Sequence, residues 1–170
     1  MNMLARRAAA ALDRTAVALA AVACFGAPTA PEFPLDAPPS ALELKYGGFG
    51  FGSHDVLLRG DTLVVTRITD FRPDSTRTTR VVPTRVAWAD FWRAADAAGV
   101  RSWPHACSNT DIVDGGGFSL RIAYAGGRVE ASGANSYPQR DGHCGGSADW
   151  TPEYSAFAAA VSRLIGGPFP

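Results

Sequence analysis

Apolar residues recur with the period of an α-helix in two parts of the chain. The first part lies between Thr84, a typical N-cap residue, and Gly99, and its apolar positions are Trp88, Phe91, Trp92 and Ala95. The second part opens at Thr151-Pro152-Glu153 and ends at residues 166–168, and its apolar positions are Tyr154, Phe157, Val161, Leu164 and Ile165. These stripes predict two amphipathic helices, one over residues 86–98 and one opening at residue 151.

Apolar runs with strand-like spacing occupy residues 41–46, 54–59, 62–69 and 78–83. Gly60-Asp61 separates the second run from the third as a two-residue hairpin loop. Such a loop pairs Leu58 with Leu63 and Val56 with Val65 on one face, and Leu57 with Val64 on the other. Because both faces are apolar, we expect this hairpin to be covered at least in part on both sides.

A second hairpin is predicted after residue 116. Residues 117–124 alternate cleanly, and a turn at Gly126-Gly127 would pair Tyr124 with Val129 and Ile122 with Ala131, leaving Glu130 diagonal to Arg121. The order of strands, helix, hairpin and helix predicts an α+β fold. We expect one domain over residues 41–167, an antiparallel sheet of about four to six strands with both helices packed on one face.

The first 40 residues have the pattern of an export signal and a tether. Residues 1–23 combine a basic start with a short apolar run ending in an A-x-A site, which predicts a signal peptide cleaved before Cys24. The segment before Cys24 resembles a degenerate lipobox, so Cys24 is a candidate lipidation site. Plain secretion and a cytoplasmic amphipathic helix are the alternatives. Residues 24–40 contain five prolines and predict an extended linker. We expect export to the periplasm or, as a lipoprotein, to the outer membrane, or alternatively secretion.

Composition and charge favour a globular domain. Hydrophobic residues make up 46% and charged residues 19%, and 16 Lys and Arg balance 16 Asp and Glu, so we expect no nucleic-acid partner. One group of arginines, Arg72, Arg77, Arg80 and Arg85, surrounds a predicted hairpin turn that also contains Asp70 and Asp74. That group is either a solvated rim or a site for an anionic partner.

Cysteine and histidine spacing suggests a structural bridge. Cys107 and Cys144 remain after Cys24 and are expected to form a disulfide in an exported protein. The alternatives are free thiols and a zinc site made with His105 and His143. Calcium held by loop residues Asn109, Asp111, Asp114 and Asp141 is a further alternative, although their spacing is not that of an EF-hand. We therefore assign no metal ligand and no cofactor.

Catalytic motifs do not stand out. The sequence has no G-x-S-x-G element, and residues 47–52 (GGFGFG) lack a phosphate-binding pattern and predict a tight turn carrying Phe49 and Phe51. A hydrolase that uses His54 or His143 is the enzymatic alternative. We expect a protein that is not an enzyme.

A long stretch without a predicted element runs from Gly133 to Trp150, 18 residues. Loops of this length are usually functional or disordered. If this loop binds a partner, its contacts should come from Asn135, Tyr137, Gln139 and Arg140, which combine an aromatic ring with adaptable polar groups. A lid that merely covers the sheet edge is the structural alternative, and disorder is the third.

Several segments resemble a bacterial family of small exported or lipid-anchored proteins without assigned function. The segments are 46–50 (YGGFG), Trp103-Pro104, Asp114-Gly115 leading into 118–122 (FSLRI), and 132–138 (SGANSYP), which together span most of residues 44–165. The Gly-Gly-Phe-x-Gly opening and the late hairpin more distantly resemble emfourin-type inhibitors of thermolysin-like metallopeptidases, which are small α+β domains. This likeness implies a peptidase as one candidate partner but assigns no inhibitory residues. We expect an envelope domain that binds another protein; a hydrolase or a purely structural lipoprotein are the alternatives.

Overall fold

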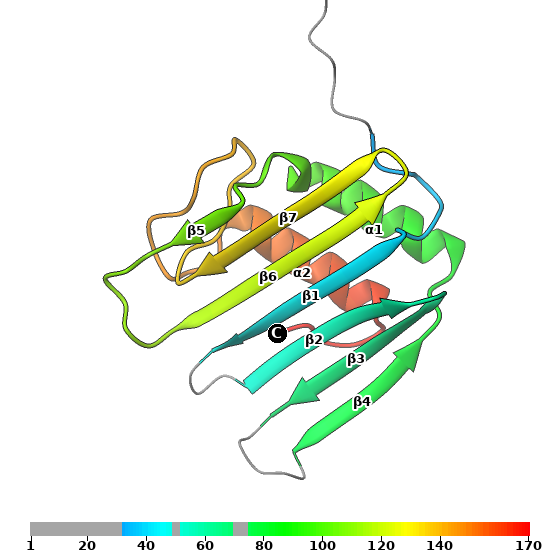
Figure 1. The fold of residues 1–170 in the computed structure, drawn as a ribbon, viewed down its shortest axis with the longest axis horizontal. Coiled ribbons are helices and arrows are strands. Elements are labelled where there is room, and N and C mark those ends of the chain that lie inside the picture. The colour runs from blue at the N-terminus through cyan, green and yellow to red at the C-terminus, as the bar shows by residue number, and fades with distance from the viewer. Residues whose placement is uncertain (1–31, 49–51, 70–74) are drawn as a thin grey trace, which may run out of the picture. The chain divides into compact units, whose positions relative to one another are not determined.

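The computed structural model describes residues 32–48, 52–69 and 75–170. Figure 1 shows an open sheet with the strand order β4-β3-β2-β1-β6-β7-β5. All neighbouring strands run antiparallel except β5 and β7. The elements are β1 (Ala41–Gly48), β2 (Gly52–Arg59), β3 (Thr62–Ile68), β4 (Thr76–Val81), α1 (Arg85–Ala97), the 3-10 turn η1 (Val100–Ser102), β5 (Ala106–Ser108), β6 (Gly116–Tyr124), β7 (Gly127–Ala134) and α2 (Pro152–Leu164).

The α+β class is confirmed, and the expected strand number is too low because β5 was not predicted. Its three residues, Ala106–Ser108, show no apolar alternation that a reader of the sequence could use. Pairing with β7 and the burial of Cys107 hold this short strand at the edge of the sheet.

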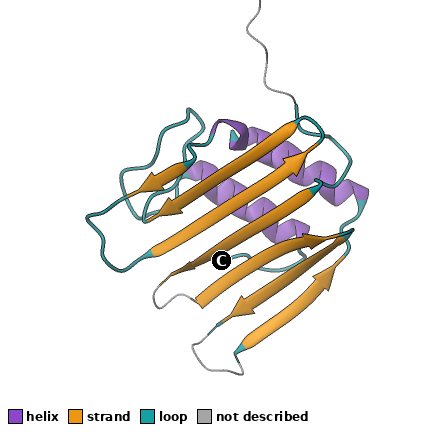
Figure 2. Cartoon of the chain, viewed as in Figure 1, coloured by secondary structure: helices purple, strands orange, loops and turns teal. Residues whose placement is uncertain are grey.

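Both helices form where their apolar stripes predict them, and Figure 2 shows them on the same side of the sheet. Thr84 Oγ1 accepts a hydrogen bond from the Ala87 amide at 3.1 Å, and Thr151 Oγ1 accepts one from the Tyr154 amide at 3.2 Å. These caps satisfy amides that the first helical turn leaves without partners. The predicted apolar stripes are buried against the sheet, so the core lies in the layer between helices and strands.

The first hairpin has the predicted register, and the second does not. Leu58 pairs with Leu63 and Val56 with Val65, as expected. In the second hairpin Tyr124 pairs with Gly127, so the loop is Ala125-Gly126 and every predicted pair is displaced by two residues. A two-residue displacement keeps every side chain on its face, so the apolar pattern cannot distinguish the two registers.

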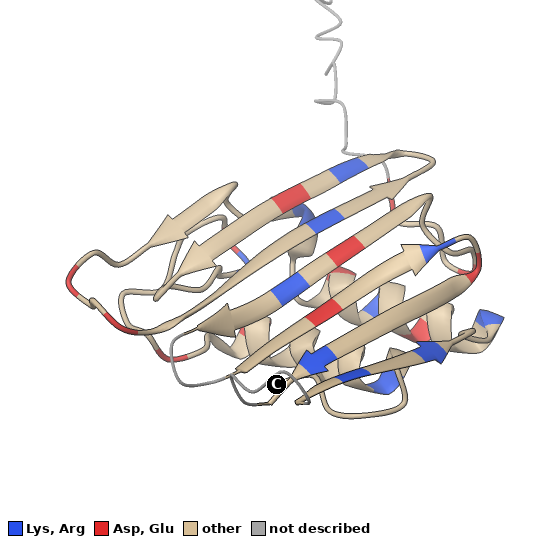
Figure 3. Cartoon of the chain, turned by 60° about the horizontal axis from the view of Figure 1, so that its bottom comes forward, with Lys and Arg blue, Asp and Glu red and all other residues tan. Residues whose placement is uncertain are grey.

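The face of the sheet that points away from the helices is open in the described part of the chain. Figure 3 marks the charged positions along the strands, which form a band across the middle of the sheet. Leu57 and Val64, which lie on the open face, are only partly buried, so the expectation of cover on both sides of the first hairpin is wrong for its outer face. Antiparallel sheets commonly leave one face to solvent in this way.

The domain starts earlier and ends later than the sequence suggests. Phe33, inside the predicted linker, is 5% exposed, and its ring stacks on Trp92 with 4.8 Å between centroids. The Trp92 indole N–H also donates a 2.7 Å hydrogen bond to the Ala37 carbonyl. At the other end Phe169 is buried. The predicted signal peptide and Cys24 lie outside the described residues, and no helix in the described ranges is long and apolar enough to span a membrane.

Candidate binding surfaces

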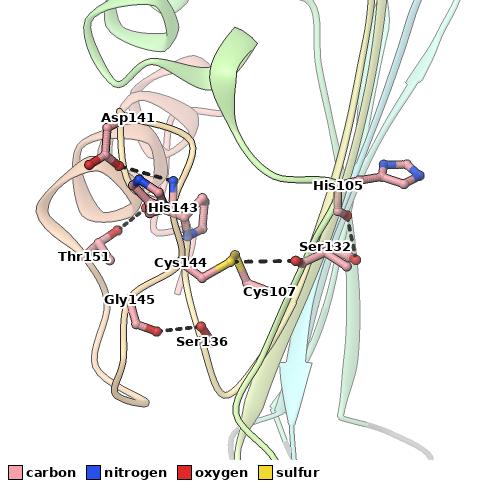
Figure 4. The surroundings of a disulfide bond; sticks show 11 residues. His105, Cys107, Ser132, Ser136, Asp141, His143, Cys144, Gly145 and Thr151 are labelled. Atoms are coloured by element: carbon pink, nitrogen blue, oxygen red, sulfur yellow. Dashed lines mark hydrogen bonds between the residues drawn. A yellow bond between two sulfur atoms is a disulfide. The ribbon is translucent and has the colours of Figure 1, made fainter.

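A disulfide joins Cys107 on β5 to Cys144 in the loop between β7 and α2, with 5.5 Å between their Cα atoms. This pairing confirms the prediction. It also removes two of the four ligands that the zinc alternative requires, because a disulfide sulfur is not a thiolate. Figure 4 shows the imidazoles of His105 and His143 on opposite sides of the strand, far from a shared coordination geometry. The bridge therefore fastens the loop to the edge of the sheet.

Tyr137, the aromatic residue expected to contact a partner, points into the core. It is 2% exposed, and its ring lies 4.6 Å from Tyr154 and 5.8 Å from Phe118. The prediction of a partner contact is therefore wrong for Tyr137. The sequence identifies an aromatic anchor in the loop, but it does not tell whether that anchor is directed outward or inward.

The other predicted contact residues lie in two different surroundings. Asn135 has a φ of 55° and donates from Nδ2 to the Ile112 carbonyl at 2.9 Å, so its amide joins two loops of the domain. Gln139 and Arg140 lie in a tight turn, where the Gln139 amide donates to the His143 carbonyl at 2.9 Å. Of the four residues only Arg140 is exposed.

Hydrogen bonds within the loop and at its end hold it in one conformation. The Ser136 hydroxyl donates to the Gly145 carbonyl at 2.7 Å, and the Thr151 hydroxyl donates to the Pro138 carbonyl. Both hydroxyl-bearing residues are buried. Together with the disulfide, these contacts support the lid reading of residues 133–150 over a flexible binding loop.

Two lid residues, Tyr137 and Trp150, pack against Tyr46 and Tyr154 and form with them an aromatic cluster. Burial raises the pKa of Tyr137 far above its usual range, and hydrogen-bonding interactions with the side chains of Tyr46 and Trp150 act on it as well. Burial likewise raises the pKa of Tyr154, whose hydroxyl has no hydrogen-bond partner in the described part of the chain. The phenols therefore stay neutral at physiological pH and serve the core.

The open face carries a row of alternating charges that sequence reasoning did not identify. Glu43 on β1, Arg121 on β6 and Glu130 on β7 lie directly opposite one another in the register. Arg121 Nε lies 3.3 Å from a Glu130 oxygen, and its Nη1 lies 4.0 Å from a Glu43 oxygen. His105 Nε2 ends the row, 4.0 Å from Glu130. We call these four residues the charged row.

A shallow depression of about 380 Å³ runs along the charged row. Besides the charged side chains it is lined by two small hydroxyl residues, Ser119 and Ser132. Ser119 lies opposite Lys45 on one side and Ser132 on the other. The depression therefore offers charges of both signs and hydroxyl groups on a rigid backbone.

The edge strand β4 presents a second kind of surface. Residues 76–80 of this strand are all exposed, and the side chains of Arg77 and Arg80 make no hydrogen bond or ion pair with any described residue. Two members of the predicted arginine group thus lie on a free edge. Arg85 instead pairs with Asp36, and Arg72 lies outside the described residues.

The histidines proposed for a hydrolase are not paired with carboxylates in the described ranges. The His54 ring packs edge-on against Phe169, and its Nδ1 is buried without a partner. Burial and the charge of Arg67 lower the pKa of His54, while Asp55 opposes that shift. His143 is exposed, and only its backbone amide bonds to Asp141.

The structure also bears on the calcium alternative and on the glycine-rich segment 47–52. Asn109 Oδ1 accepts from the Asp111 amide at 3.1 Å, an Asx turn of the kind common in loops, and among the described residues no group of His, Cys, Asp and Glu could hold a metal ion. Gly48 pairs with Gly52, so the chain does reverse at the glycine-rich segment. Phe49 and Phe51 lie outside the described residues.

Comparison with known proteins identifies no relative from which a function could be inferred. No protein-family model matches the chain, and no curated protein matches its sequence. The resemblance to exported bacterial proteins and to emfourin-type inhibitors therefore stays a prediction.

Proposed function

We propose that this protein is an exported, non-enzymatic binding domain that holds a protein partner on the open face of its sheet. The observation that carries the proposal is the charged row with its depression. Arginine is enriched at protein interfaces, and Arg121 lies at the centre of the row, with a side chain that is 62% exposed. Complementary charges on a partner would fix its register on the sheet.

The rigidity of the face supports this use. Neighbouring strands hold Glu43, Arg121 and Glu130 in one line, and the Ser132 hydroxyl donates to the His105 carbonyl at 3.1 Å. A surface that is already ordered loses little conformational entropy on binding. The helices and the lid stabilise this scaffold from the other side and from its edge.

The disulfide favours a location outside the cytoplasm, where such bonds persist. Export through residues 1–23, with a lipid on Cys24 or with plain secretion, is consistent with it. A peptidase is the partner class that the emfourin likeness suggests. A hydrolase and a purely structural lipoprotein are the competing functions.

Two matched serine substitutions test the proposal. Ser119→Arg adds a long cation in the depression, and Ser155→Arg adds the same group on the exposed side of α2. Oxidised protein is immobilised and exposed to envelope extract, and bound proteins are identified by mass spectrometry. We expect wild type and Ser155→Arg to retain the same partner and Ser119→Arg to lose it. Equal retention by both variants would place the binding site elsewhere, and no retained protein would favour the structural reading.

A further inference from the structure

The outer edge of β4 is a free template for one more strand. The Thr69 amide donates to the Ser75 carbonyl at the start of the β3–β4 ladder. In an antiparallel ladder, bonded and non-bonded pairs alternate. The non-bonded pairs are then Ile68 with Thr76, Thr66 with Thr78, and Val64 with Arg80. The amides and carbonyls of Thr76, Thr78 and Arg80 therefore point away from the sheet.

Charge distinguishes this edge from the rest of the sheet. β3 and β4 together carry three cations, Arg67, Arg77 and Arg80, and no acidic residue. Arg77 lies opposite Arg67 on the helix side, whereas Arg80 lies opposite Val64 on the open face. A strand added to β4 would therefore meet one unpaired guanidinium on each face.

Pairing with a second copy of β4 is disfavoured by the same residues. Antiparallel pairs centred on Arg77 or on Arg80 would place that arginine opposite its own copy, and pairs centred on Thr78 or on Thr79 would place Arg77 or Arg80, respectively, diagonal to its own copy. Like charges directly opposite each other destabilise a strand pair. Charged side chains on an edge strand protect a sheet against self-association. On β4 all of these charges are positive.

We propose that β4 binds an extended acidic segment of a protein partner by strand addition. This inference rests on the proposed function, because it takes the ligand to be a protein. The contact that it describes, at the edge of β4, is separate from the charged row. The backbone groups of the three outward-pointing residues provide affinity, and the two arginines select for acidic side chains. The residues that face Arg77 and Arg80 in the added strand are three positions apart, because the arginines themselves are.

The three-residue spacing can be tested with two peptides that have the same composition and differ only in the spacing of their glutamates. The probe is a fluorescent, end-blocked hexapeptide with glutamate at its second and fifth positions and threonine or valine elsewhere. The control peptide has the same composition with glutamate at its second and fourth positions, where both carboxylates project to one face. Fluorescence anisotropy with the oxidised protein should show binding of the probe, and about two- to fivefold weaker binding of the control.

Two pairs of variants separate the contributions of charge and backbone. Arg77→Glu combined with Arg80→Glu should weaken probe binding about tenfold or more, while Arg128→Glu with Arg163→Glu, the same charge change elsewhere, should leave it unaltered. Thr78→Pro removes an outward amide and should also abolish strand addition, whereas Thr78→Ala keeps that amide and should bind. Hydrogen exchange should slow at Thr76, Thr78 and Arg80 when the probe is added.

Several results would overturn the inference: no probe binding to wild type at millimolar concentration, equal binding of both peptides, or binding that survives Thr78→Pro. None of these affects the retention of a partner that Ser119→Arg abolishes. Failure of strand addition is thus distinguishable from failure of the proposed function.

Discussion

Replacing Tyr154 with phenylalanine removes one hydroxyl group from the centre of the core. Tyr154 is 0% exposed and lies 4.6 Å from Tyr137 and 4.7 Å from Phe118, measured between ring centroids. Its hydroxyl has no hydrogen-bond partner in the described part of the chain. The folded state therefore carries a polar group that has lost its water without gaining a bond.

The magnitude follows from the cost of such a group. A buried hydroxyl without a partner costs about 1–3 kcal/mol, and the small void left by its removal returns part of that gain. We expect Tyr154→Phe to raise the free energy of unfolding by about 1 kcal/mol. For a domain of this size the midpoint of thermal unfolding should rise by about 3 °C.

Tyr137 provides the matched control, because the same substitution removes a hydroxyl that interacts with Tyr46 and Trp150. Tyr137→Phe should lower the free energy of unfolding by about 1 kcal/mol. Two tyrosines in contact, changed in the same way, should thus shift stability in opposite directions. Chemical denaturation of the oxidised variants, followed by tryptophan fluorescence, measures both.

Alkaline pH gives an independent readout of the same hydroxyl. The pKa of Tyr154 is raised in the folded protein, so its neutral form is favoured there. The stability linked to this group is complete below the ordinary pKa of about 10 and is lost as the pH rises above it. Wild type should lose more stability between about pH 8 and about pH 11 than Tyr154→Phe does. A loss of 1 kcal/mol or more by Tyr154→Phe at neutral pH would refute the reasoning.

Three further perturbations test separate parts of the structure. Cys144→Ser opens a bridge across 37 positions and should lower the free energy of unfolding by about 4 kcal/mol on the chain-entropy model, a difference that disappears when both proteins are unfolded in reductant. Phe33→Ala should cost about 3–5 kcal/mol if the segment before β1 belongs to the core, and a change near zero in denaturant titrations would restore the linker reading. His54 has a lowered pKa, so stability should fall as the pH drops from about 7 toward the folded-state pKa. His54→Gln should reduce that fall; equal slopes in wild type and His54→Gln would contradict the assignment.

The elements with strong periodicity could be predicted from the sequence. Trp88, Phe91 and Trp92 define one helix face, and threonine caps define where both helices start. The first hairpin was predicted in its exact register because Gly60-Asp61 is the only turn signal between its strands. The second hairpin offers glycines at 126 and 127, and its alternation is compatible with either turn.

Features that depend on tertiary contacts could not be predicted in the same way. β5 is held by its neighbour strand and by Cys107, not by its own pattern. Phe33 is flanked by prolines in the sequence, so the segment looks like a linker. In the structure its ring packs against Trp92 and Tyr124. The predicted partner contact of Tyr137 is wrong for a related reason. A loop has no periodicity from which the direction of a side chain can be inferred.

The charged row shows where local pattern stops being informative about a site. Glu43, Arg121 and Glu130 each occupy a polar position of an alternating strand, so their exposure follows from the sequence. Their adjacency does not, because it requires β1 to lie between β2 and β6, which brings residues near 43 beside residues near 121. The register predicted from the Gly126-Gly127 turn differs by two residues from the observed one and replaces the direct Arg121–Glu130 pair with a diagonal one. The site therefore depends on strand order and register, the two properties of a sheet that a single sequence constrains least.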